Sequence, residues 1–519
     1  MILSTLGTGL FIGAGQALAV GGPAALVGSY VFLSILMYCL TTAVAEVAAH
    51  QPRPFGTLIT HGYQYSSGHL GFSLAYLRWY TLAMMVPFEV TTAMVSLGQW
   101  DPAPSVAIRI TAVTLAIFLF NMLPEREFMR SEIIFTGLKL FTTVGFMIVS
   151  IYMAIRDIPG TSIRGFHYWH EPGPFSEYLV PGNGGRALGF LQCLLYTVIA
   201  FSFVPELIVQ KVERREVENP SSILRSTRLS SLLLFTLYTV SAFMMTFMSP
   251  FDEPLLTNDG LGAGASPFVV GIDQTGIRAL SILARAMICI SSVASGRSFL
   301  HHSSRTLCAL AETGHAPTLF TARNRLSVPY VAVVASALFS VFGYLSVSVS
   351  SSSVHNSLLY FITTSGSISW LGACLVYIRF RRQTADEGFL QVYQSSIQPY
   401  GVYLGIAGCA VLPIANSLLM AFPSPPADEA PALSGLKIRN AVPVYTSIAM
   451  FWMLYLSHRF RTSLTQGFTS FRTLPDEQTQ NKARAGSARS SGQRVWWEMA
   501  RSRKDAPPHQ AEAESTMGP

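Results

Sequence analysis

The sequence predicts an all-α polytopic membrane protein that crosses a bilayer about twelve times. Half of its 519 residues are hydrophobic, only 12% are charged, and its mean hydropathy is +0.40. Soluble domains carry about 25% charged residues, so most of this chain is expected in lipid. Apolar stretches of roughly 20 residues, the length that spans a bilayer, recur from the start of the chain to about residue 460.

These stretches define the expected helices in chain order. The expected spans are 1–20, 24–48, 71–99, 105–123, 131–155, 187–210, 229–250, 268–296, 328–350, 355–378, 400–422 and 441–460. Together they make a membrane domain at 1–460. Residues 461–519 mix Arg, Lys, Ser, Gln and Pro with few apolar side chains, so we expect a cytoplasmic, disordered tail there.

Charge predicts the orientation of these helices. Basic residues gather in alternate connections: Arg126, Arg130, Lys211, Arg214, Arg215, Arg225, Arg228, Arg305, Arg323, Arg325, Arg379, Arg381 and Arg382. The connection at 251–267 instead holds three acidic residues and neither Lys nor Arg. Because cytoplasmic loops carry the excess of Lys and Arg, both termini are expected in the cytoplasm.

The first expected helix is interrupted by glycine. Its run Gly7-Thr8-Gly9-Leu10-Phe11-Ile12-Gly13-Ala14-Gly15 holds four glycines in nine residues. Hydrocarbon offers no partner to a free N–H or C=O group, so a loosened backbone is tolerated only where it lines a cavity. Residues 7–15 are therefore the first candidate binding site. Only six residues precede Gly7 and no signal peptide is recognisable, so we expect the true start of the protein upstream.

The expected helix at 187–210 contains a second interruption, Phe201-Ser202-Phe203-Val204-Pro205-Glu206. Pro205 removes a backbone donor and clashes with the preceding turn, and Glu206 puts a costly carboxylate in an apolar segment. A proline kink alone is common in membrane helices. Breaks in the first helix of each of two five-helix runs, however, indicate inverted repeats with a binding site at the breaks. The last two helices are then peripheral.

Other chemistries find little support in the sequence. The six cysteines are scattered, with no spacing that suggests disulfides or a metal site. The pair His301-His302 has no carboxylate or cysteine at metal spacing nearby, so it indicates an interfacial position. No His-Glu-x-x-His, Gly-x-Ser-x-Gly or glycine-rich phosphate loop indicates an enzyme. We therefore expect no metal, no cofactor and no nucleic-acid partner.

The residues resemble the fungal amino-acid permeases of the amino acid–polyamine–organocation superfamily. The matching segments are Gly7 to Gly13 with Gly21-Gly22-Pro23-Ala24, Gly71-Phe72 through Trp79-Tyr80, Pro87-Phe88-Glu89, Lys139, Phe166 to Trp169 with Pro172 to Phe175, Asn219-Pro220, Ser303 to Leu307 with Ala316-Pro317, and Trp370 with Arg379-Phe380-Arg381. They run in family order from residue 1 to about 420. The resemblance implies a LeuT-like core of two inverted five-helix repeats plus two peripheral helices.

The resemblance also implies uptake of an amino acid driven by a proton gradient, most simply across the plasma membrane. The backbone at the breaks suits such a substrate. Free N–H groups near Thr8, Gly9 and Leu10 would hold the carboxylate. Carbonyls around Leu6 and from Phe201 to Val204 would hold the ammonium group, next to Pro205. Phe203 is the candidate gate over the substrate, because similar families place an aromatic residue there, although helix packing explains it equally well.

Three ionisable residues are candidates for proton coupling. In similar proton-coupled relatives a lysine at the position of Lys139 replaces a sodium ion, while the alternative is a lysine that snorkels to the interface. Glu89 would carry a proton or bind a neighbouring helix. Glu206 would carry a proton or satisfy backbone N–H groups that the break leaves free.

Two departures from the family pattern leave alternatives open. The charged run 210–216 must face an inner vestibule, unless the helix ends before it. Arg285 would either select an anionic substrate or lock a contact between helices. The alternatives to a transporter are a permease-like sensor that binds an amino acid without carrying it, and a divergent, impaired transporter.

Overall fold

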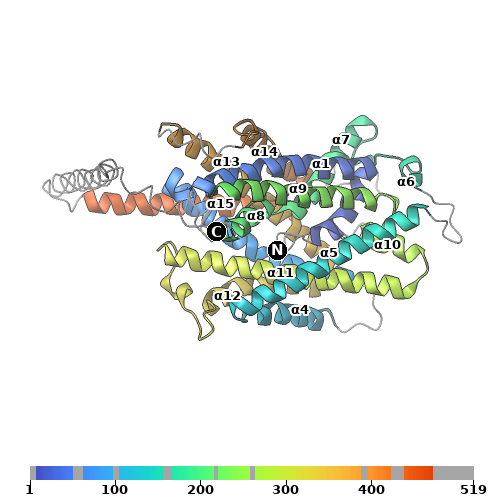
Figure 1. The fold of residues 1–519 in the computed structure, drawn as a ribbon, viewed down its shortest axis with the longest axis horizontal. Coiled ribbons are helices and arrows are strands. Elements are labelled where there is room, and N and C mark those ends of the chain that lie inside the picture. The colour runs from blue at the N-terminus through green and yellow to red at the C-terminus, as the bar shows by residue number, and fades with distance from the viewer. Residues whose placement is uncertain are drawn as a thin grey trace, which may run out of the picture. The chain divides into compact units, whose positions relative to one another are not determined.

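Long helices lie side by side through the described part of the chain (Figure 1). The computed structural model describes residues 8–50, 62–97, 105–155, 165–215, 220–257, 263–386, 395–421 and 438–470. The longer helices are α1 (Ile12–His50), α3 (Gly68–Leu97), α4 (Val106–Asn121), α5 (Glu125–Ile155), α7 (Asn183–Phe201), α8 (Val204–Arg215), α9 (Pro220–Met245), α11 (Arg278–Glu312), α13 (Ser351–Asp386), α14 (Tyr400–Ala421) and α15 (Ile438–Ser470).

Short elements connect or continue these helices. They are η2 (Thr8–Leu10), α6 (His167–His170), η3 (Pro254–Leu256), α10 (Pro267–Gln274), η4 (Thr318–Thr321), α12 (Tyr330–Ala337) and η5 (Leu338–Val347). Among the described residues, nine helical segments are long and apolar enough to cross a membrane, and α4 is a shorter apolar helix.

Every expected span has a helical counterpart, with different boundaries. α1 covers the expected spans 1–20 and 24–48 as one kinked element, and residues 1–7 lie outside the described residues. α8 continues to Arg215, so the helix does not end before the charged run that begins at residue 210. α15 continues beyond residue 460 to Ser470, into the segment expected to be a tail.

The chain divides into two compact units. The first comprises Met1–Leu456 and the second Ser457–Pro519. Of the second unit the structure describes the C-terminal part of α15, up to Ser470. The rest of the expected tail, 471–519, lies outside the described residues.

The kink in α1 explains why the chain has a Gly-Gly-Pro sequence there. Gly22 has φ +80° and ψ 176°, which is open to glycine and almost closed to other residues. The segment at 174–176 crosses this point: the Ala24 N–H donates to the Pro174 carbonyl (2.9 Å) and the Ser176 N–H to the Gly21 carbonyl (3.1 Å). Two sequence motifs that are about 150 residues apart therefore form one structural joint.

The helices of the first unit differ in how deeply they are buried. α3 packs against α11 and α13, while α1 packs against α7 and α9. Figure 1 shows α1 beside α9, and α5 beside α11. The apolar window of α3 is 83% buried, whereas that of α5 is only 33% buried. α3 is thus an interior helix, whereas most of the α5 surface faces away from the bundle.

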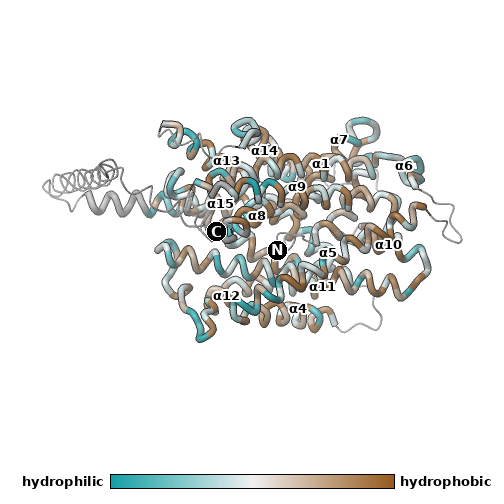
Figure 2. The backbone as a smooth tube through the Cα atoms, in the orientation of Figure 1, coloured by the Kyte–Doolittle hydropathy of each residue, from teal (hydrophilic) through white to brown (hydrophobic). Residues whose placement is uncertain are grey.

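The outward faces of the less buried helices are apolar. On α5, Ile134, Phe141 and Ile155 are 71%, 72% and 73% exposed, and they repeat on one side of the helix. Figure 2 shows hydrophobic residues along the helices and hydrophilic ones gathered toward helix ends, as at the start of α7. Soluble proteins rarely expose apolar faces of this extent. The surface therefore fits a lipid environment, and the protein is an integral membrane protein.

Candidate binding site at two broken helices

The glycine run near the start of the chain forms a short 3-10 turn and then an α-helix. The turn is Thr8–Leu10, Phe11 is not helical, and α1 begins at Ile12. The first N–H groups of a helix have no partner within it and carry the positive end of its dipole. The predicted carboxylate-binding residues Thr8, Gly9 and Leu10 form the turn that directly precedes the first N–H groups of α1. Leu6, the predicted carbonyl partner, lies outside the described residues.

The second break lies at Ser202 and Phe203. α7 ends at Phe201, and α8 begins at Val204, so Pro205 occupies the first turn of the new helix, where a missing N–H costs little. The break thus precedes the proline. Phe203 has φ +61°, which is uncommon for a residue that is not glycine. Its side chain is fully buried.

The two breaks touch each other. A Cβ atom added at Gly9 would lie 2.9 Å from the backbone nitrogen of Ala200, and one at Gly13 would lie 3.3 Å from the carbonyl oxygen of Tyr196. Distances under 3 Å do not occur for real Cβ atoms, so Gly9 is there because any side chain would push the two segments apart. The end of α7 and the turn at Thr8–Leu10 therefore form one polar backbone patch inside the bundle.

α13 borders this patch on another side. A Cβ atom added at Gly366 would lie 3.8 Å from the Ser202 hydroxyl. The side chains of Phe203 and Val204 are 0% and 1% exposed. The patch thus combines donors at the start of α1 with carbonyls at the end of α7. That combination complements a carboxylate and an ammonium group on one small molecule.

Lys139 on α5 and Glu89 on α3 face neighbouring positions of α11. The Lys139 ammonium group, on α5, donates a hydrogen bond to the Ser295 hydroxyl at 2.7 Å and is buried. The next residue, Gly296, faces α3: a Cβ atom there would lie 3.4 Å from the Glu89 Cβ. One turn of α11 therefore links two of the three predicted coupling residues, and Lys139 lies inside the bundle.

Glu206 lies elsewhere, in a buried ion pair. Its Oε2 accepts a hydrogen bond from Nη1 of Arg78 on α3 at 3.0 Å, and its Oε1 accepts one from the Ser369 hydroxyl at 3.5 Å. Eleven residues separate Arg78 from Glu89 on α3, which is about 16 Å along a helix. The three predicted coupling residues therefore do not form one cluster.

The comparisons with known proteins decide the family. The sequence model described as "Amino acid permease" matches residues 1–465. This chain belongs to the amino-acid permease family. The proline-specific permease of Emericella nidulans is 32% identical to this permease, over 88% of this chain and 82% of the relative. The general amino-acid permease GAP1 of Saccharomyces cerevisiae is 28% identical, over 88% of this chain and 74% of the relative.

A solved structure supports the fold independently. A point mutant of the Eremococcus coleocola manganese transporter has a TM-score of 0.52 to this permease at 14% identity, over 88% of this chain and 94% of that chain. That likeness shows the fold alone. The predicted fold class is confirmed: the permease is all-helical among its described residues, with a LeuT-like core of two inverted repeats and two peripheral helices. Its family assigns it to amino-acid transport across a membrane.

Sequence reasoning missed Arg78, the partner of Glu206. Its signal was present, because Arg78 is a full charge inside the otherwise apolar expected helix 71–99. An intramembrane charge calls for an opposite charge at similar depth. The hypothesis that Glu206 serves the freed backbone did not include this partner.

Two further arginines of the permease are paired with acids. Arg297 is fully buried, bonds to Glu132 on α5, and its guanidinium carbon lies 4.2 Å from the ring centre of Phe128. This pairing compensates the buried charge of Arg297 on α11. Arg285 contacts Asp273 with an Nη2–Oδ2 distance of 2.5 Å. The Asp273 contact supports the alternative in which Arg285 locks two elements together. Arg285 also lines a cavity.

Proposed function

We propose that this permease is a secondary active transporter that moves L-amino acids across the plasma membrane by alternating access, with protons as the coupling ion. The contact between the two broken helices at Gly9 and Ala200 carries the proposal. It joins donors and acceptors of the backbone at one place inside a membrane bundle. Backbone N–H and C=O groups without helical partners are tolerated in a membrane where a polar molecule binds to them.

The substrate would lie with its carboxylate on the N–H groups near Thr8, Gly9 and Leu10. Its ammonium group would lie on the carbonyls near Phe201 to Val204. Phe203, which is buried and held at φ +61°, would cover the substrate as a gate. Since one relative is a proline-specific permease, L-proline is the first substrate to test. A backbone cradle of this kind recognises the groups that all amino acids share, and the surrounding side chains set the preference among them.

Alternating access needs half-helices that can tilt separately. The two-residue break before α8 and the turn before α1 supply such hinges. Beyond the break, Gln16 Nε2 on α1 donates to Asn356 Oδ1 on α13 at 2.8 Å. This neutral bond joins the first half of α1 to α13, and Tyr377 and Glu46 join the same two helices elsewhere. Two neutral groups can separate and bind water at little net cost, as a gate requires.

Lys139 is the proposed coupling residue. Its ammonium group bridges α5 to α11 through Ser295, so its protonation state bears on how these two helices pack. Glu89 touches the same turn of α11 and would assist. Glu206 is already matched by Arg78, and its proposed part is to position α8.

Uptake of radiolabelled amino acids tests the proposal. The permease, expressed in cells that lack their own amino-acid permeases, is expected to give saturable uptake of at least one of the twenty, with L-proline first in the panel. An uncoupler is expected to abolish accumulation. If protein detected at the cell surface takes up none of them, transport is wrong. Uptake that ignores the uncoupler would leave amino-acid transport standing and reject proton coupling.

A further inference from the structure

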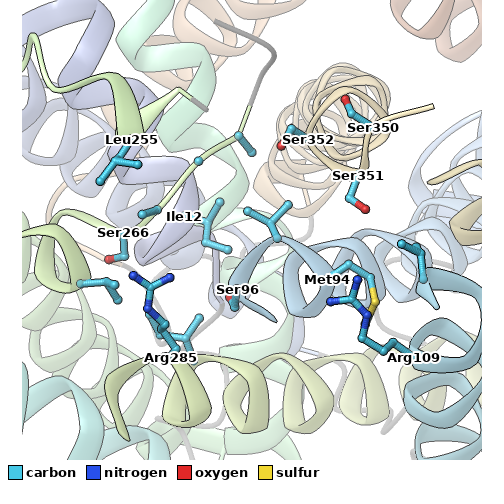
Figure 3. A pocket seen from close by; sticks show the side chains of 17 residues that line it. Ile12, Met94, Ser96, Arg109, Leu255, Ser266, Arg285, Ser350, Ser351 and Ser352 are labelled. Carbon is cyan, nitrogen blue, oxygen red and sulfur yellow. The ribbon is translucent and has the colours of Figure 1, made fainter. Parts of the chain in front are cut away.

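A cavity of about 280 Å³ lies where α3 ends and α4 and α13 begin (Figure 3). Its walls come from α1, α3, α4, α11, the 255–269 segment and the start of α13. The lining residues used below are Ile12, Met94, Ser96, Arg109, Leu255, Ser266, Arg285 and Ser351. Its volume is near the lower end of the ~300–1,000 Å³ typical of small-molecule sites.

The charge of this cavity is one-sided. Its described lining residues include two arginines and no carboxylate. Figure 3 shows them coming from different helices, Arg285 from α11 and Arg109 from α4. Arg285 is compensated, because it contacts Asp273 at 2.5 Å and its Nε donates to the Ser281 hydroxyl at 3.3 Å.

Arg109 is not compensated by an acid among the described residues. Its Nη1 donates to the Leu97 carbonyl at 3.2 Å, which anchors the guanidinium but neutralises nothing. Its Nε is buried and has no hydrogen-bond partner among the described residues. The cavity thus presents about one unit of positive charge and an unused donor. An anion with a single carboxylate matches both.

We propose that this cavity, the Arg109 vestibule, is a second binding site that holds the carboxylate of an amino acid on its way to or from the broken helices. The proposal rests on the proposed function, since it adds a step to the same transport path. Ile12 supports the connection: it lines the vestibule and is also the first residue of α1, next to the Thr8–Leu10 turn. The vestibule therefore adjoins the proposed carboxylate end of the central site.

The rest of the lining suits the remainder of an amino acid. Hydroxyl groups of Ser96, Ser266 and Ser351 surround the space, and Met94 and Leu255 give it apolar walls. Hydroxyls accept as well as donate hydrogen bonds, so they can face an ammonium group. Among the lining residues that the structure describes, no acid competes for Arg109. The vestibule would select for the carboxylate and accept different amino-acid side chains. A site that the substrate occupies before it reaches the central site needs no further selectivity.

A cysteine probe tests the charge preference without requiring transport. Ser351→Cys places a thiol in the vestibule, on a half-buried position. The measured quantity is the ratio of two labelling rates, that of the anionic sulfonatoethyl methanethiosulfonate over that of the cationic trimethylammonium reagent. We expect this ratio to be higher at Ser351→Cys than for a free thiol in solution. Arg109→Gln should lower this rate ratio on the order of threefold, because the guanidinium attracts the anionic reagent and repels the cationic one. Arg109→Lys should keep most of it.

Arg382→Gln is the matched control, because Arg382 is an exposed arginine at the opposite end of α13. Adding L-proline should slow the labelling of Ser351→Cys, whereas L-prolinamide, which lacks the carboxylate, should not. The wild-type chain, with its six native cysteines, gives the background. An unchanged rate ratio in Arg109→Gln, or equal protection by proline and prolinamide, would overturn the vestibule.

Uptake kinetics separate this proposal from the proposed function. Arg109→Gln is expected to raise KM for L-proline several-fold, to leave the maximal rate unchanged, and to lose the dependence of KM on ionic strength that a charged site confers. If the wild-type permease transports proline and Arg109→Gln has the same KM and the same dependence of KM on ionic strength, the proposed vestibule site is wrong and the transport function stands. If the wild type transports nothing, the labelling experiment still decides the vestibule.

Discussion

Arg78 on α3 and Glu206 on α8 form an ion pair of 3.0 Å inside the bundle, with side chains only 8% and 2% exposed. Glu206 lies in the first turn of the half-helix that follows the second break. Because the apolar window of α3 is 83% buried, the pair joins the half-helix that follows the break to an interior helix. The Ser369 hydroxyl adds a third helix, α13, to the contact.

Removing Arg78 alone should destabilise the permease strongly. Arg78→Gln leaves a carboxylate buried without its cation, which costs about 3–5 kcal/mol in comparable pairs. The double variant Arg78→Gln with Glu206→Gln leaves no charge behind and should recover most of the loss. The measurement is the temperature at which detergent-solubilised protein loses its monodisperse peak in size-exclusion chromatography.

Arg130→Gln is the control for this experiment. Its partner Glu127 is three residues away on an exposed turn, with both side chains about half exposed, and such pairs contribute about 0–1 kcal/mol. If Arg78→Gln had the same melting temperature as Arg130→Gln, the buried pair would not hold α8. The double variant, by contrast, is expected to melt close to Arg130→Gln.

Gly9→Ala should abolish substrate binding while the protein still reaches the membrane. The added methyl group would lie 2.9 Å from the Ala200 nitrogen, so the two breaks must separate and the backbone cradle loses its geometry. Binding of labelled substrate to purified protein gives the readout. Gly137→Ala is the matched control, because a Cβ atom there meets nothing within 4 Å. Normal binding by Gly9→Ala would reject the carboxylate assignment.

The positions of the breaks could be predicted from the sequence because backbone chemistry is local. Glycine spacing and Pro205 mark where a helix cannot close, and the structure breaks within a few residues of each. The helices followed from apolar length alone. The second break lies at Ser202 and Phe203, just before Pro205. It precedes the proline because proline is favoured in the first turn of a helix.

Pairings between distant segments could not be predicted in this way. Arg78 and Glu206 are 128 residues apart in the chain, and Lys139 and Ser295 are 156 apart. Each sequence signal shows a charge that needs a partner but not which helix supplies it. The vestibule was beyond prediction for the same reason, because Arg109 lies near the start of one helix and gains meaning only beside Arg285 and Ser351.

Neutralising Lys139 should uncouple transport from protons. Lys139→Met removes the ammonium group, so uptake is expected to lose its dependence on a pH gradient while exchange of internal for external substrate persists. Ser295→Ala keeps the charge and removes its 2.7 Å hydrogen bond, a bond to a charged group worth about 1.5–3 kcal/mol. It should therefore weaken coupling without abolishing it.

Ser150→Ala is the matched serine control, because that hydroxyl is buried on α5 and donates to the Phe146 carbonyl of its own helix. Uptake by reconstituted vesicles with imposed pH gradients separates the three variants. Unchanged proton dependence in Lys139→Met would remove this lysine from the mechanism and leave Glu89 as the next candidate.

The joint at Gly22 makes a prediction about stability rather than transport. Gly22→Ala must hold φ +80°, a conformation that costs other residues about 1–3 kcal/mol, and its Cβ would lie 2.9 Å from the Phe175 Cα and the Pro174 oxygen. Both neighbours are backbone atoms that the Ala24 and Ser176 hydrogen bonds hold in place. The variant should unfold at clearly lower temperature, whereas Gly145→Ala, with nothing within 4 Å, should match or exceed the wild type because alanine favours a helix over glycine. Equal melting of the two variants would mean that the 174–176 segment yields without cost and that the joint does not set the angle between the two halves of α1.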